Sequence, residues 1–378
     1  MWWTKIIFFI LSVSAVLYLL LIFAFTEGWN RLDKHLFSHR NLSTRVSIVV
    51  AFRNEGTRPV TLLQALLQQS FPAELLEILF VDDHSTDDGP QQLQAMISRL
   101  KLPRVRVLTS PGRGKKAALR QGIRQATGRL ILTTDADTIP GPGWVTAMVT
   151  LYEEKKMRLI LGPVVYSHEQ TFLQKLFSLD FMSLVASGAG SAGLGLPFMG
   201  NAANMAFEKQ LFSDADAQAL SAGFASGDDV FFIHYVRRKY GWKAITFFKN
   251  ERAIVRTPPP ENLRDFLAQR IRWGSKARGY TQPWALFVSY TVFLFNFLLT
   301  ALLVTGFFLH WAWIVYGLFI ALKALIDFPL LYAFGRFVHK RNLLPLIIPF
   351  EMIYPLYITF VAFRGLFPYH WKNRKWSR

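Results

Sequence analysis

The chain has 378 residues, of which 52% are apolar, 15% are aromatic and only 18% are charged. Its 43 Lys and Arg residues against 25 Asp and Glu residues give a formal net charge of +18, and Cys is absent. This composition excludes disordered, collagen-like and disulfide-stapled proteins as well as cysteine chemistry, and its basic excess favours a nucleic-acid surface or an anionic membrane as partner.

The first expected element is an apolar run over residues 6–25, about the twenty residues that a helix needs to cross hydrocarbon. A secretory signal would have a shorter apolar region followed by small residues, whereas Phe23, Phe25 and Trp29 stand at those positions. We therefore expect residues 1–28 to form a transmembrane anchor. More basic residues follow this run than precede it, so the positive-inside rule places the next region in the cytoplasm.

Residues 43–280 alternate short apolar runs with amphipathic stretches. This pattern predicts an α/β domain with a mostly parallel sheet covered by helices on both faces. Ligands of such sheets bind beyond the carboxyl ends of the strands. The expected strands are residues 46–52, 77–81, 104–109 and 130–134, and the expected helices are residues 57–69, 89–100, 115–126 and 143–154.

Acidic residues follow two of these strands. Asp82 and Asp83 come after one strand, and Asp135 and Asp137 come after another. The second pair could ligate Mg²⁺ or Mn²⁺ together with substrate phosphates, because hard cations prefer oxygen ligands. The simpler alternative for either pair is a solvated turn or a helix cap.

A third acidic pair, Asp228 and Asp229, precedes a helix-like run over residues 230–240. Asp229 could cap that helix, or it could act as a general base toward a substrate. Position in the sequence does not decide between these two roles.

Two glycine motifs do not meet the requirements of nucleotide-binding loops. G-K at residues 114–115 resembles the end of a P-loop, but Lys116 stands where Ser or Thr must bind magnesium. Gly188, Gly190 and Gly193 spell G-x-G-x-x-G after a helix-like stretch rather than after a strand. We expect a flexible loop there and not a dinucleotide site.

Gln269, Arg272 and Trp273 lie on one face of a helix expected to begin near Glu261. Arg and Gln side chains could bind a diphosphate, and a Trp ring could stack on a sugar. A membrane-interface helix with an aromatic residue at its end is the alternative.

Three further apolar segments follow, and then a basic tail over residues 364–378. Lys323 and Asp327 are four residues apart, so they could pair inside the membrane or face water at a shallow depth. Prolines interrupt the last segment, and we expect it to be a re-entrant hairpin or an interfacial helix that keeps the tail cytoplasmic. The expected segments, within residues 284–363, are residues 284–309, 312–334 and 343–363.

Four motifs occur in the order seen in membrane-bound family 2 glycosyltransferases. They are V-D-D-H-S-T-D at 81–87, D-A-D at 135–137, G-D-D at 227–229 and Q-R-I-R-W at 269–273. The chain thereby resembles cellulose, hyaluronan and poly-N-acetylglucosamine synthases and ceramide glucosyltransferase over residues 43–280. The resemblance implies a GT-A fold, a divalent cation (Mg²⁺ or Mn²⁺) and inverting transfer from a nucleotide-sugar, such as a UDP-sugar, to a lipid-linked or glycan acceptor.

The resemblance also implies residue roles. Asp229 would be the catalytic base, and Asp137 with Asp135 would hold the metal. The donor would contact Asp83, Lys115, Asp135, Gln269 and Arg272, and the acceptor would contact Trp273, Asn201 and Asp228.

The membrane part is small for a polymer synthase, which uses more helices to build a channel. A processive polysaccharide synthase is therefore the second hypothesis, and a non-catalytic nucleotide-sugar-binding membrane protein is the third. A nucleic-acid partner is not expected, because the basic residues cluster beside the apolar segments. The expected location is the bacterial inner membrane, with the catalytic domain in the cytoplasm.

Overall fold

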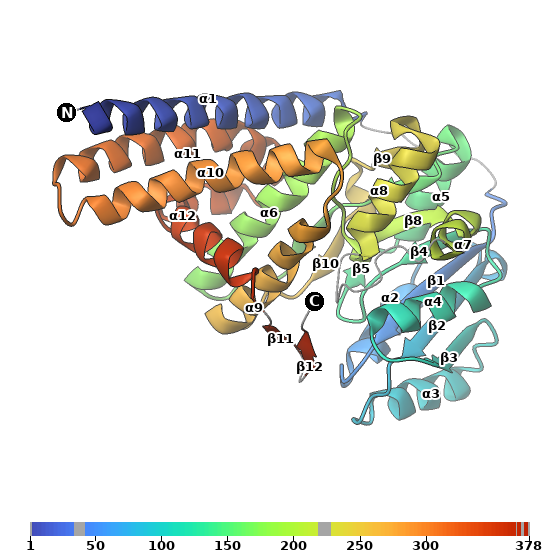
Figure 1. Ribbon diagram of the computed structural model, residues 1–378. Coiled ribbons are helices and arrows are strands. Elements are labelled where there is room, and N and C mark those ends of the chain that lie inside the picture. The colour runs from blue at the N-terminus through green and yellow to red at the C-terminus, as the bar shows by residue number, and fades with distance from the viewer. Residues whose placement is uncertain (1, 34–41, 218–227, 368, 372–373, 377–378) are drawn as a thin grey trace.

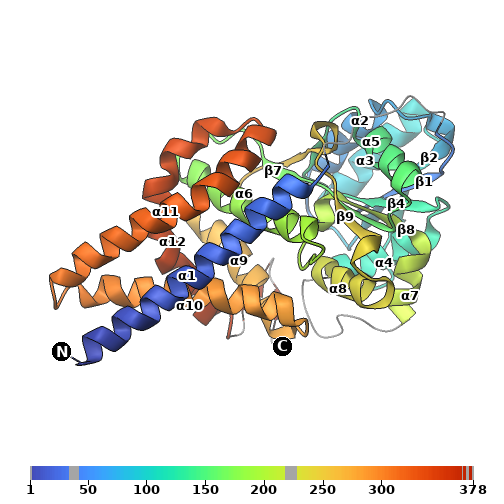
Figure 2. The same cartoon turned by 90° about the horizontal axis from the view of Figure 1, so that it is seen from above.

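A computed structural model describes residues 2–33, 42–217, 228–367, 369–371 and 374–376. Two lobes stand side by side in it (Figure 1). The sheet lobe contains the main β-sheet and its covering helices. The helix lobe consists of long helices from both ends of the chain, with α6 (Phe172–Gly193) between them and the sheet (Figure 2).

The main sheet of the described residues has seven strands in the order β3-β2-β1-β4-β8-β6-β9. The first four run parallel, with Val46 paired to Leu76 on one side and to Leu130 on the other, while β8 runs antiparallel to both of its neighbours. The expected mostly parallel GT-A-like sheet is therefore confirmed. The strands are β1 (Val46–Phe52), β2 (Leu76–Asp82), β3 (Val105–Thr109), β4 (Leu130–Thr133), β6 (Leu159–Leu161), β8 (Met205–Glu208) and β9 (Ile245–Phe247).

Both faces of this sheet are buried because successive residues of a strand point to opposite sides. In β1, Ile48 and Val50 pack into the core under α2, α3 and α5, whereas Val49 and Ala51 pack into the core that contains α4, α7 and α8. The covering helices are α2 (Arg58–Leu67), α3 (Gly89–Leu100), α4 (Lys115–Gln125), α5 (Trp144–Lys155), α7 (Lys209–Ala217) and α8 (Asp228–Tyr240).

A smaller three-stranded sheet joins the two lobes. It places β10 (Val255–Thr257) between β5 (Ile139–Pro140) and β7 (Val164–Tyr166). Because β5 starts two residues after Asp137, this sheet fixes the chain just beyond the D-x-D sequence.

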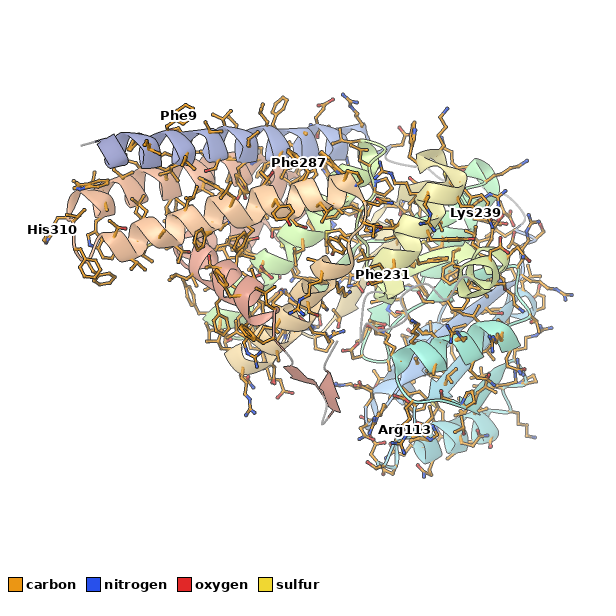
Figure 3. The ribbon with its side chains drawn as sticks, viewed as in Figure 1. Phe9, Arg113, Phe231, Lys239, Phe287 and His310 are labelled. Carbon is orange, nitrogen blue, oxygen red and sulfur yellow. The ribbon has the colours of Figure 1, made fainter. Side chains whose placement is uncertain are left out.

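Four helical segments in the described part of the chain are long and apolar enough to cross a membrane. Large apolar side chains such as Phe9 and Phe287 lie on the outside of the helix lobe, whereas Arg113 and Lys239 lie on the sheet lobe (Figure 3). α1 packs along α10 and α11. The segments are α1 (Trp2–Arg31), α10 (Pro283–Thr305), α11 (Trp311–Phe337) and the run of η6 (Arg341–Leu346) with α12 (Ile347–Arg364).

The expectation of a flexible loop at the G-x-G-x-x-G sequence is wrong, because all three glycines lie in α6. They allow α6 to approach α1 closely: a Cβ atom on Gly190 would lie 2.2 Å from the carbonyl oxygen of Phe25, and one on Gly193 would lie 1.9 Å from that of Gly28. Small residues serve this purpose where helices pack in membranes.

Lys323 and Asp327 form a buried ion pair, so the water-facing alternative for them is wrong. The Nζ atom of Lys323 is 2.7 Å from Asp327 and 2.5 Å from Glu351 of α12, and the Tyr18 hydroxyl of α1 donates to Asp327 at 2.9 Å. Lys323 has no exposed surface. This cluster joins α1, α11 and α12 inside the helix lobe.

The last apolar segment is one continuous helical run, so of the two expected forms the hairpin is wrong and the interfacial helix stays a prediction. Both ends of this run nevertheless contact residues that come before α10 in the sequence and lie outside the four apolar segments. Lys340 pairs with Glu169 just before the run, and Arg278 donates to the carbonyl oxygen of Gly365 just after it. The prolines are accommodated within the run.

Candidate active site

A single cavity of about 1910 Å³ extends from the carboxyl edge of the sheet to α9 (Leu263–Gly274) and onward between the long helices. It brings together residues that are far apart in the sequence. The side chain of Asp228 lies outside the described part of the structure. The other residues expected in the site all line this cavity: Asp83, Lys115, Asp135, Asp137, Asn201, Asp229, Gln269, Arg272 and Trp273.

The donor-side residues Asp83 and Lys115 meet at the strand ends. An Asp83 carboxylate oxygen accepts a hydrogen bond of 2.6 Å from the backbone N–H of Gly114, directly before α4. Lys115, the first residue of α4, forms an ion pair with Asp135 beyond β4. The side chain of Asp83 therefore holds the loop before α4 and does not cap α3, and Asp88, the N-cap residue of α3, makes no side-chain cap either.

Asp135 and Asp137 bring two carboxylates into the cavity, close enough for their charges to interact. Burial and the neighbouring charge of Asp135 raise the pKa of Asp137 to about 6, and Glu55 adds to this effect. Among the described residues no group of three His, Asp or Glu side chains could hold an ion unaided. The two carboxylates nevertheless fit Mg²⁺ or Mn²⁺, because such ions take their remaining ligands from diphosphate oxygens and water.

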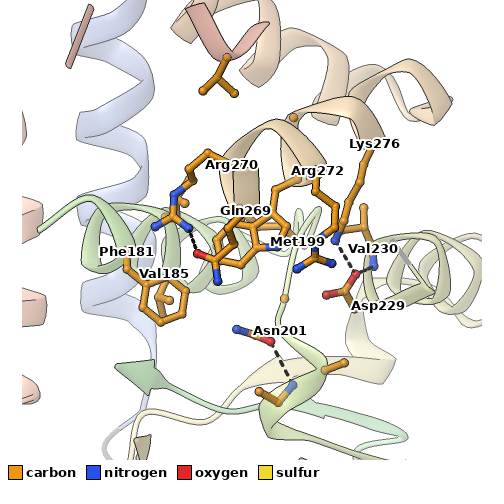
Figure 4. Close-up of a pocket in the computed structure, with 18 of the residues that line it drawn as sticks. Phe181, Val185, Met199, Asn201, Asp229, Val230, Gln269, Arg270, Arg272 and Lys276 are labelled. Carbon is orange, nitrogen blue, oxygen red and sulfur yellow. Dashed lines mark hydrogen bonds and ion pairs between the residues drawn. The ribbon is translucent and has the colours of Figure 1, made fainter. Parts of the chain in front are cut away.

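Asp229 lies at the start of α8, where its contacts are compatible both with a helix cap and with a general base. Its Oδ1 atom accepts from the backbone N–H of Val230 at 2.9 Å and from Nζ of Lys276 at 3.1 Å. Burial pushes the pKa of Asp229 upward, but the charge of Lys276 and the hydrogen bond from Val230 outweigh it and keep the pKa below its ordinary value. The carboxylate is therefore ionised at neutral pH at the edge of the cavity (Figure 4).

The helix that carries Gln269 and Arg272 begins where Asn262 accepts a hydrogen bond from the backbone N–H of Asp265. The amide oxygen of Gln269 accepts from the Tyr166 hydroxyl at 3.0 Å and from Arg270 at 2.6 Å. These contacts orient the amide with its oxygen toward Tyr166 and Arg270 and its NH₂ group away from them.

Figure 4 shows Gln269 and Arg272 extending from α9 into the region of Asn201 and Asp229. Asn201 precedes a 3-10 turn over Ala202–Asn204, and its side chain accepts from the backbone N–H of Ala203 at 3.0 Å. Amide, guanidinium and carboxylate groups from three separate segments therefore face a common space.

Trp273 is positioned by a buried network behind the cavity. The guanidinium of Arg270 lies 4.3 Å from the centre of the Trp273 ring and donates to Asp180 of α6 at 2.6 Å. The Tyr357 hydroxyl of α12 donates to the same carboxylate at 2.5 Å. One face of the Trp273 ring is therefore occupied by a cation, and α9 is tied to two helices of the helix lobe.

We expect Asp180→Asn to lower the free energy of unfolding by about 3–5 kcal/mol, because it leaves the buried Arg270 guanidinium without its counter-charge. Asp180 and Arg270 are 1% and 3% exposed, so solvent cannot replace the lost charge. Thermal unfolding in detergent measures the effect. Asp214→Asn, which breaks an exposed pair with Lys239, is the matched control and should leave the melting temperature unchanged. Equal melting temperatures for the two variants would contradict the structural role of the Asp180 network.

Sequence reasoning missed several residues of the site. Glu55 and Arg58, which line the cavity beside Asp137, follow β1 and carry no motif of their own. Lys276, by contrast, could have been predicted from its spacing in the sequence. It follows Gln269 by seven residues and Arg272 by four, so it continues the same helical face by one more turn.

The cavity continues from these polar groups into the helix lobe, where aromatic and aliphatic side chains line it. Phe25 of α1, Val288 and Phe293 of α10, and Ile358 of α12 contribute to this part, and Asp327 and Glu351 of the buried ion-pair cluster line it as well. The cavity is therefore mostly apolar between the long helices and polar at the sheet.

Two family profiles match the chain. "Glycosyl transferase family 2" matches residues 47–209, and "Glycosyl transferase family group 2" matches residues 130–334. An undecaprenyl-phosphate 4-deoxy-4-formamido-L-arabinose transferase of Yersinia enterocolitica is 30% identical over 149 residues, which are 39% of this chain and 45% of that protein. A dodecaprenyl-phosphate galacturonate synthase of Rhizobium johnstonii is 31% identical over 136 residues, 35% of this chain and 40% of that protein. The matched segment thus spans less than half of these curated relatives.

Among solved structures, a mannosyltransferase from Pyrobaculum calidifontis in complex with GDP-Man and Mn²⁺ has a similar fold. The TM-score is 0.59 at 16% sequence identity, and the match covers 87% of this chain and 99% of that chain. The two curated relatives described above are a transferase and a synthase named for polyprenyl phosphates, rather than the cellulose and hyaluronan synthases that the motifs resemble.

Proposed function

Since the chain belongs to glycosyltransferase family 2, we propose that it transfers a sugar from a nucleotide-sugar to a lipid acceptor at a membrane surface, with inversion at the anomeric carbon. The observation that carries this proposal is the single cavity that joins the acidic strand ends, the Gln269 and Arg272 face and an apolar space between long helices. Such a cavity would hold the nucleotide-sugar at the sheet and the apolar chain of the acceptor between the helices.

The donor would occupy the sheet side of the cavity. Asp83 would contact the nucleotide base, and Lys115, which pairs with Asp135 of the D-x-D sequence, would contact the donor as well. Arg272 and the NH₂ group of Gln269 would bind the diphosphate from the opposite wall, since guanidinium and amide donors suit phosphate oxygens. UDP-sugars and GDP-sugars both meet these requirements.

A divalent cation would be held by Asp137 and Asp135. Mg²⁺ or Mn²⁺ at this position would supply positive charge to the diphosphate as it leaves. Support comes from the raised pKa of Asp137, because two crowded carboxylates favour a cation between them.

In the proposed step an acceptor oxygen attacks the anomeric carbon. The bond from that carbon to the acceptor forms while its bond to the diphosphate breaks, and the nucleoside diphosphate leaves with the electron pair. Asp229 accepts the proton of the attacking group, which is the P–OH of a singly protonated polyprenyl phosphate or the hydroxyl of a glycan or lipid alcohol, and Arg272 stabilises the charge that develops on the leaving diphosphate. Trp273 and Asn201 would contact the acceptor, with Asp228 in support of Asp229.

The acceptor would carry an apolar chain. The apolar part of the cavity supports this, and the relatives named for polyprenyl-phosphate acceptors agree with it. The processive synthase remains a second hypothesis, because a growing glycan could also occupy a cavity that continues between helices.

The proposed function also assigns a location to each part of the chain. Residues 1–28 would anchor the chain, residues 43–280 would form the cytoplasmic domain, and residues 284–363 would hold the remaining membrane helices. Because both ends of the last helical run contact the residues before α10, the tail over residues 364–378 would lie on the cytoplasmic side of a bacterial inner membrane. We expect reporters fused at Asn41 and at Arg378 to be cytoplasmic, and a periplasmic reporter at either position would contradict this topology.

The proposal is tested by release of nucleoside diphosphate from a panel of UDP- and GDP-sugars. Purified protein in lipid nanodiscs with Mn²⁺ should turn over one donor only when a polyprenyl phosphate or a membrane lipid extract is present. Binding of a donor without release under any of these conditions would favour a non-catalytic nucleotide-sugar-binding protein.

A further inference from the structure

Lys276 is a buried cation that the proposed chemistry does not yet use. It lies in η5 (Ser275–Gly279), the 3-10 turn that continues α9 toward α10, and it is only 7% exposed. Its Nζ atom is 3.1 Å from Oδ1 of Asp229 (Figure 4). The ion pair therefore links the expected base to the end of the helix that carries Gln269 and Arg272.

A buried carboxylate needs such a partner. Moving an ionised carboxylate out of water favours its protonated form, and a protonated Asp229 could not accept a proton from an acceptor. In this site burial is the largest influence on the pKa of Asp229, and the charge of Lys276 is the largest influence that opposes it.

We propose that Lys276 is a positioning residue that keeps Asp229 ionised and correctly placed at the cavity wall. This inference rests on the proposed function, because it concerns the base of the same reaction. Lys276 thereby extends the functional helix face of the Gln269–Trp273 motif by one more turn. Lys276 acts through Asp229 and does not itself touch the donor.

Other charged groups around Asp229 do not replace Lys276. Lys115 of α4 acts on Asp229 from farther away and is paired with Asp135. Arg272 of α9 and Tyr280, which follows η5, also lie at this end of the cavity, and burial together with the charge of Asp229 raises the pKa of Tyr280. Burial lowers the pKa of His234, one turn along α8, to about 4, so this residue is neutral near pH 7.

The test is the pH dependence of sugar transfer by Lys276→Met. Without Lys276 the pKa of Asp229 should rise, because burial would then act without the largest influence that opposes it. Activity of Lys276→Met should therefore fall off at a higher pH than that of the wild type as the solution is acidified, and it should recover toward the wild-type value as the pH rises to 9. The donor KM should stay within a few-fold of wild type.

Two further variants and a control complete the experiment. Lys276→Arg keeps the charge and should retain the wild-type pH profile, and Lys276→Met combined with Asp229→Asn should be no slower than Asp229→Asn alone. Lys239→Met removes another lysine paired with a carboxylate, Asp214 at 2.8 Å, and should change nothing.

Three results would overturn the proposal. They are a loss of activity in Lys276→Met that is the same at every pH, a large increase in its donor KM, or a double variant much slower than Asp229→Asn. Failure of the proposed function is recognised separately, because the wild-type protein would then transfer no sugar at any pH.

Discussion

Asp229→Asn is expected to lower kcat by roughly 10²–10⁴-fold, the usual contribution of a positioned general base. Asparagine has the size of aspartate and can still accept the hydrogen bond from Val230, so α8 should keep its start. Donor affinity should barely change, because a base acts on the acceptor. Stopped-time assays of transfer with titrations of the donor separate the two quantities.

Asp228→Asn is the internal control for this result, because the neighbouring acid has a supporting role and should show the smaller loss. If Asp229 only caps α8, both variants should remain near the wild-type rate, since asparagine caps a helix about as well as aspartate. A large loss in Asp228→Asn with normal turnover in Asp229→Asn would assign the base to the other carboxylate.

Removal of divalent cations is expected to abolish transfer. Charge stabilisation of a leaving group by a metal contributes several kcal/mol, which corresponds to a loss on the order of 10²–10³-fold or more. EDTA should also weaken donor binding, and added Mn²⁺ or Mg²⁺ should restore both. Calorimetric donor titrations with and without EDTA, together with rate measurements, test this expectation.

Asp137→Asn should reproduce the effect of EDTA and should not be rescued by added Mn²⁺. Asp214→Asn, at an exposed ion pair remote from the cavity, is the control and should keep full metal-dependent activity. Full activity in EDTA would contradict the assignment of Asp135 and Asp137 to a cation.

Local patterns in the sequence predict much of the fold. The β1 and β4 strands are almost entirely apolar, and the acids that follow strands must meet at one edge of a parallel sheet. The sequence alone therefore places Asp83 and Asp135 close together. The expected start of the Gln269 helix is also close to the observed one, because Asn262 provides a local capping signal.

Contacts between distant residues cannot be predicted in the same way. Asp180 and Arg270 are 90 residues apart, and Asp229 and Lys276 are 47 apart, so no short window of sequence contains either pair. The wrong expectation for the glycines of α6 has the same cause. These glycines allow α1 to lie against α6. Gly190 contacts Phe25 only once these two helices, which are far apart in the sequence, have packed together.

The most direct measurement of the central claim follows a radiolabelled sugar from its nucleotide donor into an organic-soluble product. Wild-type protein in nanodiscs with Mn²⁺ and a polyprenyl phosphate or lipid extract should produce one labelled glycolipid of inverted anomeric configuration, and Asp229→Asn should produce almost none. A water-soluble polymer instead would establish the processive synthase. Label that remains entirely in the donor, with every donor and lipid supplied, would contradict the account.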